Sequence, residues 1–313
     1  MMEVIRKVAI VGAGLVGRGW AIVFARAGHD VAIYDGSAEI RAAVIESIRA
    51  SLADMRETGL VDAIDPVLRR LRVVDTLEAA VAGADYIQES VLERRDVKQA
   101  VCLEIDRAMR PDAVVGSSSS GIPASAFTEG CVNRARFLVA HPVNPPHLIP
   151  LVELVPAPWT DAGIVPWLRA QMEQVGQAAI IVRKEVDGFV LNRLQGALLN
   201  EAWALLEEGV ASAADIDLTV SHGLGYRWSF MGPFETIDLN APGGIADYAR
   251  RLGPLYHAIA LARRDPAPWS EALIAKAEAE RREKLPASDL SERSAWRDRN
   301  LMALVAHKRR TGV

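Results

Sequence analysis

The stretch KVAIVGAGLVGRGWA, residues 7–21, decides the fold class of this chain. A short apolar run leads into Gly12, and Gly14, Gly17 and a segment of helical pattern follow it. In a strand–turn–helix unit of this kind, the first glycine permits a tight turn and the second lets backbone amides approach a phosphate. The third lets helix and strand pack closely. The stretch therefore predicts a phosphate-binding turn between a β-strand and an α-helix.

An acidic residue follows at the distance that a dinucleotide site needs. The next apolar run, VAIYD at 31–35, ends with Asp35, where a carboxylate would accept hydrogen bonds from ribose hydroxyls and repel a 2′-phosphate. We therefore predict NAD as the cofactor, rather than NADP, and a merely structural glycine turn is the alternative. The cofactor contacts predicted in this region are Gly12, Gly14, Leu15, Val16, Gly17 and Asp35.

Further short apolar runs alternate with helical segments through the first half of the chain. This βαβ pattern is typical of a mostly parallel sheet covered by helices on both faces, a Rossmann-type α/β fold. After residues 178–188 no strand pattern remains, so we predict an NAD-binding domain over residues 1–187 and an all-helical substrate and dimerisation domain over residues 188–313. The predicted strands lie at 8–12, 31–35, 71–74, 85–89, 113–117, 137–141 and 151–155.

Composition narrows the possible partners. The formal net charge is −4 and the pI is near 5.9, so nucleic acid and membrane surfaces are unfavourable partners and small molecules are favoured. The apolar N-terminal run is broken by glycines and Arg18, which fits a folded domain better than a signal or a membrane segment. Cys102 and Cys131 lie in no metal-ligand spacing, which predicts reduced thiols in the cytoplasm and no structural metal.

Two titratable side chains lie on either side of a proline-rich loop in AHPVNPPHLIPLVELVP, residues 140–156. Strand alternation places Glu153 on the same face as Leu151 and Val155, and an unpaired carboxylate buried there would cost several kcal/mol, so it needs a partner. His141, at the end of the preceding strand, is the nearest candidate in sequence. We predict that the loop joins neighbouring strands and brings the two side chains together as a proton-transferring pair.

Two other polar positions border this region. Four serines, residues 117–120, follow a predicted strand whose carboxyl end should face a ligand. Asn192 begins an otherwise apolar stripe on the helix that opens the second domain, so its amide either forms hydrogen bonds in the core or points into a cleft between the domains.

The chain resembles the 3-hydroxyacyl-CoA dehydrogenase superfamily along nearly its whole length. The similar segments include VGAGLVGRGWA, YIQESVLERRDVK, SSSSGIP, KEVDGFVLNRLQ and GLGYRWSFMGPFETIDLN. The resemblance implies an NAD-dependent dehydrogenase that forms a homodimer. It implies His141, Glu153, Ser120 and Asn192 as catalytic residues, with Ser120 and Asn192 also on the substrate. It further implies that Glu93 and Lys98 contact the nicotinamide or its ribose.

Two departures from the superfamily concern the substrate. The helical stretch after Asp35 contains no lysine, whereas the acyl-CoA enzymes hold coenzyme A with basic side chains there. Arg227, just before the MGP motif, is suited to bidentate recognition of a free carboxylate, or else forms an ordinary salt bridge. We therefore expect a free 3-hydroxy acid such as gulonate or carnitine.

A CoA thioester substrate, and a nucleotide-binding structural protein without turnover, are the alternatives to that expectation. Three polar residues near these motifs, His147, His222 and Asn240, receive no predicted role. The helical domain carries Trp203, Trp228, Trp269 and Trp296, more aromatic surface than one small domain needs, which favours a subunit interface there.

Overall fold

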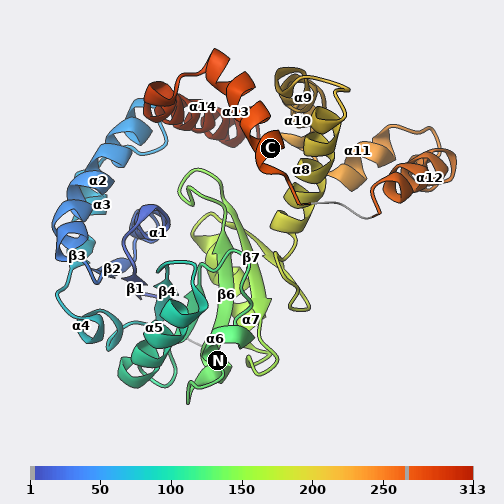
Figure 1. The fold of residues 1–313 in the computed structure, drawn as a ribbon. Coiled ribbons are helices and arrows are strands. Elements are labelled where there is room, and N and C mark those ends of the chain that lie inside the picture. Colours follow the sequence, from blue (N-terminus) through green and yellow to red (C-terminus); the bar gives the residue numbers. More distant parts are fainter. Residues whose placement is uncertain (1–3, 265–267, 313) are drawn as a thin grey trace. The chain divides into compact units, whose positions relative to one another are not determined.

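The computed structural model describes residues 4–264 and 268–312, and these form two compact units. The sheet unit comprises residues up to 193 together with 297–312, and the helical unit comprises residues 194–296. The sheet unit contains eight strands, and most of them are labelled in Figure 1. They are β1 (Lys7–Val11), β2 (Asp30–Tyr34), β3 (Leu71–Val73), β4 (Tyr86–Glu89), β5 (Val114–Ser117), β6 (Phe137–Pro142), β7 (Leu151–Pro156) and β8 (Ala178–Ile181).

The strands form one mostly parallel sheet in the order β3-β2-β1-β4-β5-β6-β7-β8. The pairing of β6 with β7 is antiparallel, and every other pairing is parallel. Each predicted run forms a strand, so the Rossmann-type α/β prediction is confirmed. Parallel strands end at the same edge of a sheet, so β1, β2, β4, β5 and β6 bring their last residues to one edge.

Helices cover both faces of the sheet because its strands are apolar on both faces. One core lies under α1, α2 and α7 and includes Met302 of the C-terminal helix, and the other lies under α4, α5 and α6. Successive residues of β4 supply the two cores in turn, with Tyr86 in the first and Ile87 in the second. The helices of this part of the chain are α1 (Leu15–Arg26), α2 (Ala38–Glu57), α3 (Asp65–Leu68), α4 (Leu77–Val81), α5 (Arg95–Ala108), α6 (Ser125–Thr128), η1 (Arg134–Arg136) and α7 (Ile164–Gln174).

Helix beginnings follow local capping chemistry. The side chain of Ser37 accepts a hydrogen bond from the N–H of Ile40 at the start of α2, and Thr76 does the same for Ala79 at the start of α4. The lysine-free segment after Asp35 is therefore a capped helix of 20 residues, α2.

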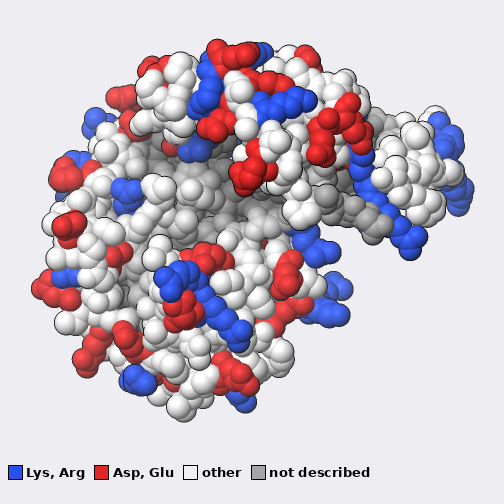
Figure 2. Space-filling view, in the orientation of Figure 1, with Lys and Arg blue, Asp and Glu red and all other residues white. Residues whose placement is uncertain are grey.

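The rest of the described chain is helical, as predicted. Its elements are α8 (Leu191–Glu207), α9 (Ala213–Thr219), η2 (Val220–Leu224), α10 (Gly225–Trp228), α11 (Pro233–Leu239), α12 (Gly244–Ala262), α13 (Glu271–Lys284), η3 (Ala287–Asp289) and α14 (Leu290–Thr311). Within residues 4–264 and 268–312, no helix has the length and apolar character to cross a membrane. Acidic and basic side chains are mixed over the face drawn in Figure 2.

Candidate active site

The three glycines of the predicted phosphate-binding turn meet different surroundings. Gly12 has φ of +95°, and a Cβ there would stand 2.5 Å from the carbonyl oxygen of Ser90. A Cβ on Gly17 would stand 1.8 Å from the carbonyl oxygen of Gly12, whereas a Cβ on Gly14 would meet no described atom within 4 Å. Close packing therefore demands the first and third glycines, and open space lies beside the second. With the amino end of α1 starting at Leu15, this arrangement fits a dinucleotide pyrophosphate.

Asp35 lies directly after β2 and is held beside this turn. One of its carboxylate oxygens accepts the N–H of Ala13 at 2.7 Å, and the other accepts the N–H of Ser37 at 2.9 Å. A carboxylate has about four acceptor positions, so both oxygens keep capacity for ribose hydroxyls.

His141 and Glu153 stand directly opposite each other on β6 and β7. The Nδ1 atom of His141 lies 2.8 Å from Oε2 of Glu153, and both side chains are buried. An ionised carboxylate can only accept, so Nδ1 carries the proton, and in a neutral imidazole Nε2 is then the acceptor. The predicted contact between the two side chains is present.

The second oxygen of Glu153 anchors the start of α8. Oε1 accepts the N–H groups of Val190 and Leu191 at 2.9 and 3.0 Å, which face it because Phe189 adopts a positive φ of 49°. Burial favours the neutral carboxyl, but the hydrogen bonds from His141, Leu191 and Val190 outweigh it and lower the pKa of Glu153. Glu153 therefore remains a carboxylate that fixes the tautomer of His141.

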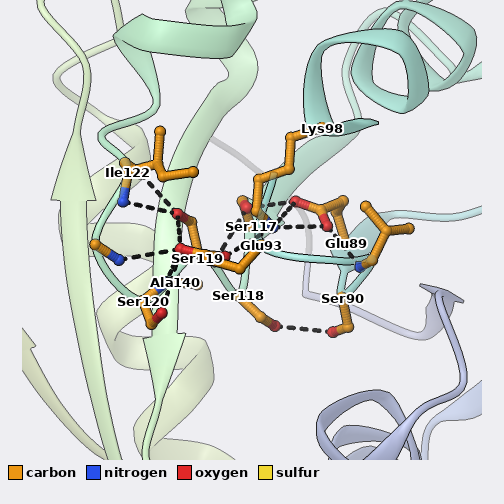
Figure 3. A network of polar contacts seen from close by, with 12 residues as sticks. Glu89, Ser90, Glu93, Lys98, Ser117, Ser118, Ser119, Ser120, Ile122 and Ala140 are labelled. Atoms are coloured by element: carbon orange, nitrogen blue, oxygen red, sulfur yellow. Dashed lines mark hydrogen bonds and ion pairs between the residues drawn. The ribbon is translucent and has the colours of Figure 1, made fainter. Parts of the chain in front are cut away.

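Glu93 holds the serine loop that follows β5 (Figure 3). Its Oε1 accepts hydrogen bonds from the Ser119 hydroxyl, from the N–H and hydroxyl of Ser120, and from the N–H of Gly121, at 2.8–3.2 Å. Burial acts to raise the pKa of Glu93, but Lys98 and these hydrogen bonds lower it overall. Asn192 donates to the Ser120 carbonyl oxygen at 2.5 Å, so its amide ties the start of α8 to the same loop.

Glu89 is the polar residue that the sequence interpretation missed. It lies fully buried at the end of β4, and Lys98 of α5, also buried, places its Nζ 3.1 Å from both Glu89 oxygens. The same Nζ lies 3.4 Å from Glu93, and Ser117 donates to Glu89 (Figure 3). A carboxylate in a central strand that is buried on both faces requires a partner, and that requirement is the signal that could have found this pair.

Three of the remaining candidate residues belong to the helical unit. Arg227 is exposed on α10 in the helical unit. His222 contacts the hydroxyl of its neighbour Ser221, and Asn240 ends α11. His147 is largely buried in the loop between β6 and β7, and its Nδ1 has no hydrogen-bond partner among the described residues. In the described parts of the chain, no group of three or more possible ligands could hold a metal, and both cysteines are free and buried.

Comparisons with known proteins identify the family of this chain. The NAD-binding domain model of 3-hydroxyacyl-CoA dehydrogenase matches residues 7–186, and the C-terminal domain model matches residues 188–286. Rabbit lambda-crystallin is 39% identical over 307 residues, covering 96% of each chain. L-carnitine dehydrogenase from Streptomyces coelicolor is 38% identical over 80% of this chain and 79% of its own length.

A solved structure extends the likeness to the whole fold. The NAD+-dependent 5-dehydrogenase of 5-formyl-3-hydroxy-2-methylpyridine 4-carboxylic acid superposes with a TM-score of 0.80 at 28% identity, covering 96% of this chain and 97% of its own. The two family models together span most of the chain, and they meet between β8 and α8. The chain belongs to the 3-hydroxyacyl-CoA dehydrogenase family, whose members are NAD-dependent dehydrogenases.

Proposed function

We propose that this enzyme oxidises the 3-hydroxyl of a small free hydroxy acid, with L-gulonate as the first choice and L-carnitine as the next. The observation that carries the proposal is the His141–Glu153 pair, which leaves one imidazole nitrogen free at the edge where the glycine turn and serine loop also lie. An unprotonated nitrogen at a ligand-binding edge is suited to removing a hydroxyl proton.

Each polar group then has a distinct task. Nε2 of His141 takes the proton of the substrate's 3-hydroxyl as hydride leaves the carbon that bears this hydroxyl. Glu153 stabilises the imidazolium that forms. The Ser120 hydroxyl, held to Glu93 at 3.2 Å, can turn to the reacting oxygen, and Asn192 lies beside it. NAD, when bound, supplies the hydride acceptor.

The cofactor contacts follow from the same edge of the sheet. We propose that the backbone amides of the glycine turn bind the pyrophosphate and that Asp35 binds the adenine-side ribose. Glu93 would contact the nicotinamide side, and Lys98, buried beneath Glu93, would keep that carboxylate charged.

Several observations favour a free acid over a CoA thioester. Helix α2 contains no lysine, and two of its arginines are bound within the protein, Arg41 to the carbonyl oxygen of Asp35 and Arg49 to Glu46. The named substrates of two relatives, L-carnitine and a pyridine carboxylic acid, both carry a free carboxylate. We propose that Arg227 binds this carboxylate, because a guanidinium can hold it bidentately. An Arg227→Ala variant should then raise KM far more than it lowers kcat, and an unchanged KM would remove Arg227 from this role.

A substrate panel tests the proposal. L-gulonate, L-carnitine, 3-hydroxybutyrate and 3-hydroxybutyryl-CoA are each supplied with NAD, and the absorbance of the reduced cofactor is followed. We expect a free acid to give the highest kcat/KM. A higher value for the thioester would favour the acyl-CoA alternative, and NAD binding without any turnover would favour a structural role.

We further propose that the protein is a homodimer that works in the cytoplasm. Several large apolar side chains of α11 and α12 are more than half exposed, among them Phe234, Leu239 and Leu255. Apolar surface of this extent in a helical unit is typical of a subunit interface. Two buried, unbridged cysteines fit a reducing compartment. Sedimentation should give twice the chain mass at micromolar concentration, and a monomer would contradict the dimer.

A further inference from the structure

A chain of hydrogen bonds runs from the core of the sheet unit to its ligand-binding edge. The Tyr86 hydroxyl donates to Oε1 of Gln88 at 2.5 Å, and Nε2 of Gln88 donates to the Ser118 hydroxyl at 2.8 Å. The Ser118 and Ser90 hydroxyls are in turn 2.8 Å apart, a contact that Figure 3 shows. None of these four side chains has a part in the reaction described above.

The buried end of this series of hydrogen bonds decides which group donates and which accepts. Tyr86 is fully buried, and burial raises the pKa of its phenol well above the ordinary value, so the hydroxyl keeps its proton. An amide oxygen can only accept, so the hydrogen bond from Tyr86 identifies the Gln88 atom beside it as Oε1 and places Nε2 on the opposite side. Both Nε2 hydrogens are then used, one on Ser118 and one on the carbonyl oxygen of Ala140 at 3.2 Å.

The last hydroxyl is left with a proton to donate. Ser118 accepts from Gln88, and in a cooperative chain it then donates its own proton to Ser90. Among the described residues, the Ser90 hydroxyl has no other hydrogen-bond partner. Tyr86 and Gln88 are fully buried, whereas Ser90 and Ser118 are only partly buried. The series of hydrogen bonds therefore ends at a hydroxyl that is partly exposed to solvent.

Ser90 lies at the centre of the predicted cofactor path. Its N–H donates to the carbonyl oxygen of Val11 at 2.7 Å, which places it against the glycine turn. The path begins at Asp35 after β2, passes the turn after β1, and must reach His141 at the end of β6. It therefore crosses the ends of β4 and β5, which Ser90 and Ser118 directly follow.

We propose that the Ser90 hydroxyl donates a hydrogen bond to an acceptor oxygen on the nicotinamide half of the cofactor, aimed there by Tyr86 and Gln88. The proposal rests on NAD binding along this edge of the sheet. Gln88 also holds the carbonyl oxygen of Ala140, the residue before His141. One buried amide thus positions both the cofactor donor and the strand end that carries the base.

Cofactor fragments test the proposal in the intact protein. A neutral hydrogen bond contributes about 0.5–1.5 kcal/mol, so Ser90→Ala should raise the Kd of NAD+ by a factor between roughly two and twelve in calorimetry. The Kd of ADP, which lacks the nicotinamide half, should stay unchanged. Ser125→Ala, at a partly buried serine elsewhere in the sheet unit, is the matched control and should change neither Kd.

A double-mutant cycle separates aiming from packing. Tyr86→Phe keeps the ring and removes the proton that orders the amide, so it should weaken NAD+ binding less than Ser90→Ala does and should add nothing when combined with it. If Tyr86 acts only through packing, the two effects add and ADP binding weakens too, which contradicts the aiming role. NAD+ binding by Ser90→Ala within twofold of the wild type overturns the proposal. A wild-type chain that binds ADP but not NAD+ would overturn the proposed function along with it.

Discussion

His141 with Glu153, and Lys98 with Glu89, are both buried pairs of a basic and an acidic side chain in the sheet unit. The first pair spans β6 and β7 and contacts the start of α8. The second pair joins β4 to α5, and the ammonium group of Lys98 also lies 3.4 Å from the carboxylate of Glu93. Each carboxylate also accepts a hydrogen bond from a further segment: Glu153 from the start of α8, and Glu89 from Ser117 at the end of β5.

The difference between the pairs lies in the base. An imidazole has two ring nitrogens, and Nδ1 of His141 is held by Glu153 while no hydrogen bond from the described residues reaches Nε2. A buried ammonium has no such second position, and Lys98 is enclosed by two carboxylates. We therefore propose proton transfer to a substrate for the histidine pair, whereas the lysine pair holds Glu89 and Glu93 beside the serine loop.

The largest expected effect follows from removing the imidazole. General base catalysis contributes about 10²–10⁴-fold, so His141→Ala should lower kcat by about a thousandfold while NAD+ binding and the circular dichroism spectrum remain near wild type. Steady-state kinetics with the best acid of the substrate panel measures the loss. Wild-type turnover in a folded His141→Ala variant would remove this residue from the base role.

Removing the ammonium should instead lower stability. Lys98→Met leaves the Glu89 carboxylate buried without its charge partner, which typically costs about 3–5 kcal/mol, measured as the unfolding free energy in urea. The double variant Glu89→Gln with Lys98→Met should recover most of that loss, because no uncompensated buried charge remains. A single variant within about 1 kcal/mol of the wild type would show that the pair is not holding the fold.

The two pairs also differ in how far the sequence reveals them. Glu153 stood out because all other residues of LVELV, 151–155, are apolar, and a histidine lies at the end of the strand before it. Glu89 and Gln88 lie in a strand whose four residues are all buried, so no alternation marks them. The partners of Glu89 come from α5 and from the end of β5, and only tertiary structure brings these elements together.

The glycine turn and the mostly parallel sheet were predictable because their sequence signals are local. The glycines, the strand before them and Asp35 lie within one βαβ unit, and the parallel sheet follows from the alternation of strands and helices. The hydrogen bonds that Glu93 accepts from Ser119, Ser120 and Gly121 join residues 26–28 positions apart in the sequence. They form because β4 and β5 are neighbours in the sheet. The sequence offered Glu93 only through family resemblance, as a cofactor contact, and not as the residue that shapes the loop.

A third base, His147, is largely buried and extends the comparison to a histidine whose Nδ1 has no hydrogen-bond partner among the described residues. Its Nδ1 faces α1, where a Cβ on Gly19 would stand 3.3 Å away. Burial, assisted by Arg26 and Arg18 on α1 and opposed by Asp298 on α14, lowers the pKa of His147 from 6.5 to about 4. His147 is therefore neutral in the folded enzyme.

The smallest expected effect is a pH dependence caused by this histidine. The unfolded chain binds a proton at His147 below pH 6.5, whereas the folded chain does so only near pH 4, so the stabilisation is complete above 6.5 and is lost as the pH falls towards 4. A pKa difference of this size corresponds to a loss of about 3 kcal/mol. His147→Asn should flatten the pH dependence of the unfolding free energy over this range. An identical slope in wild type and His147→Asn would mean that another group takes up the proton.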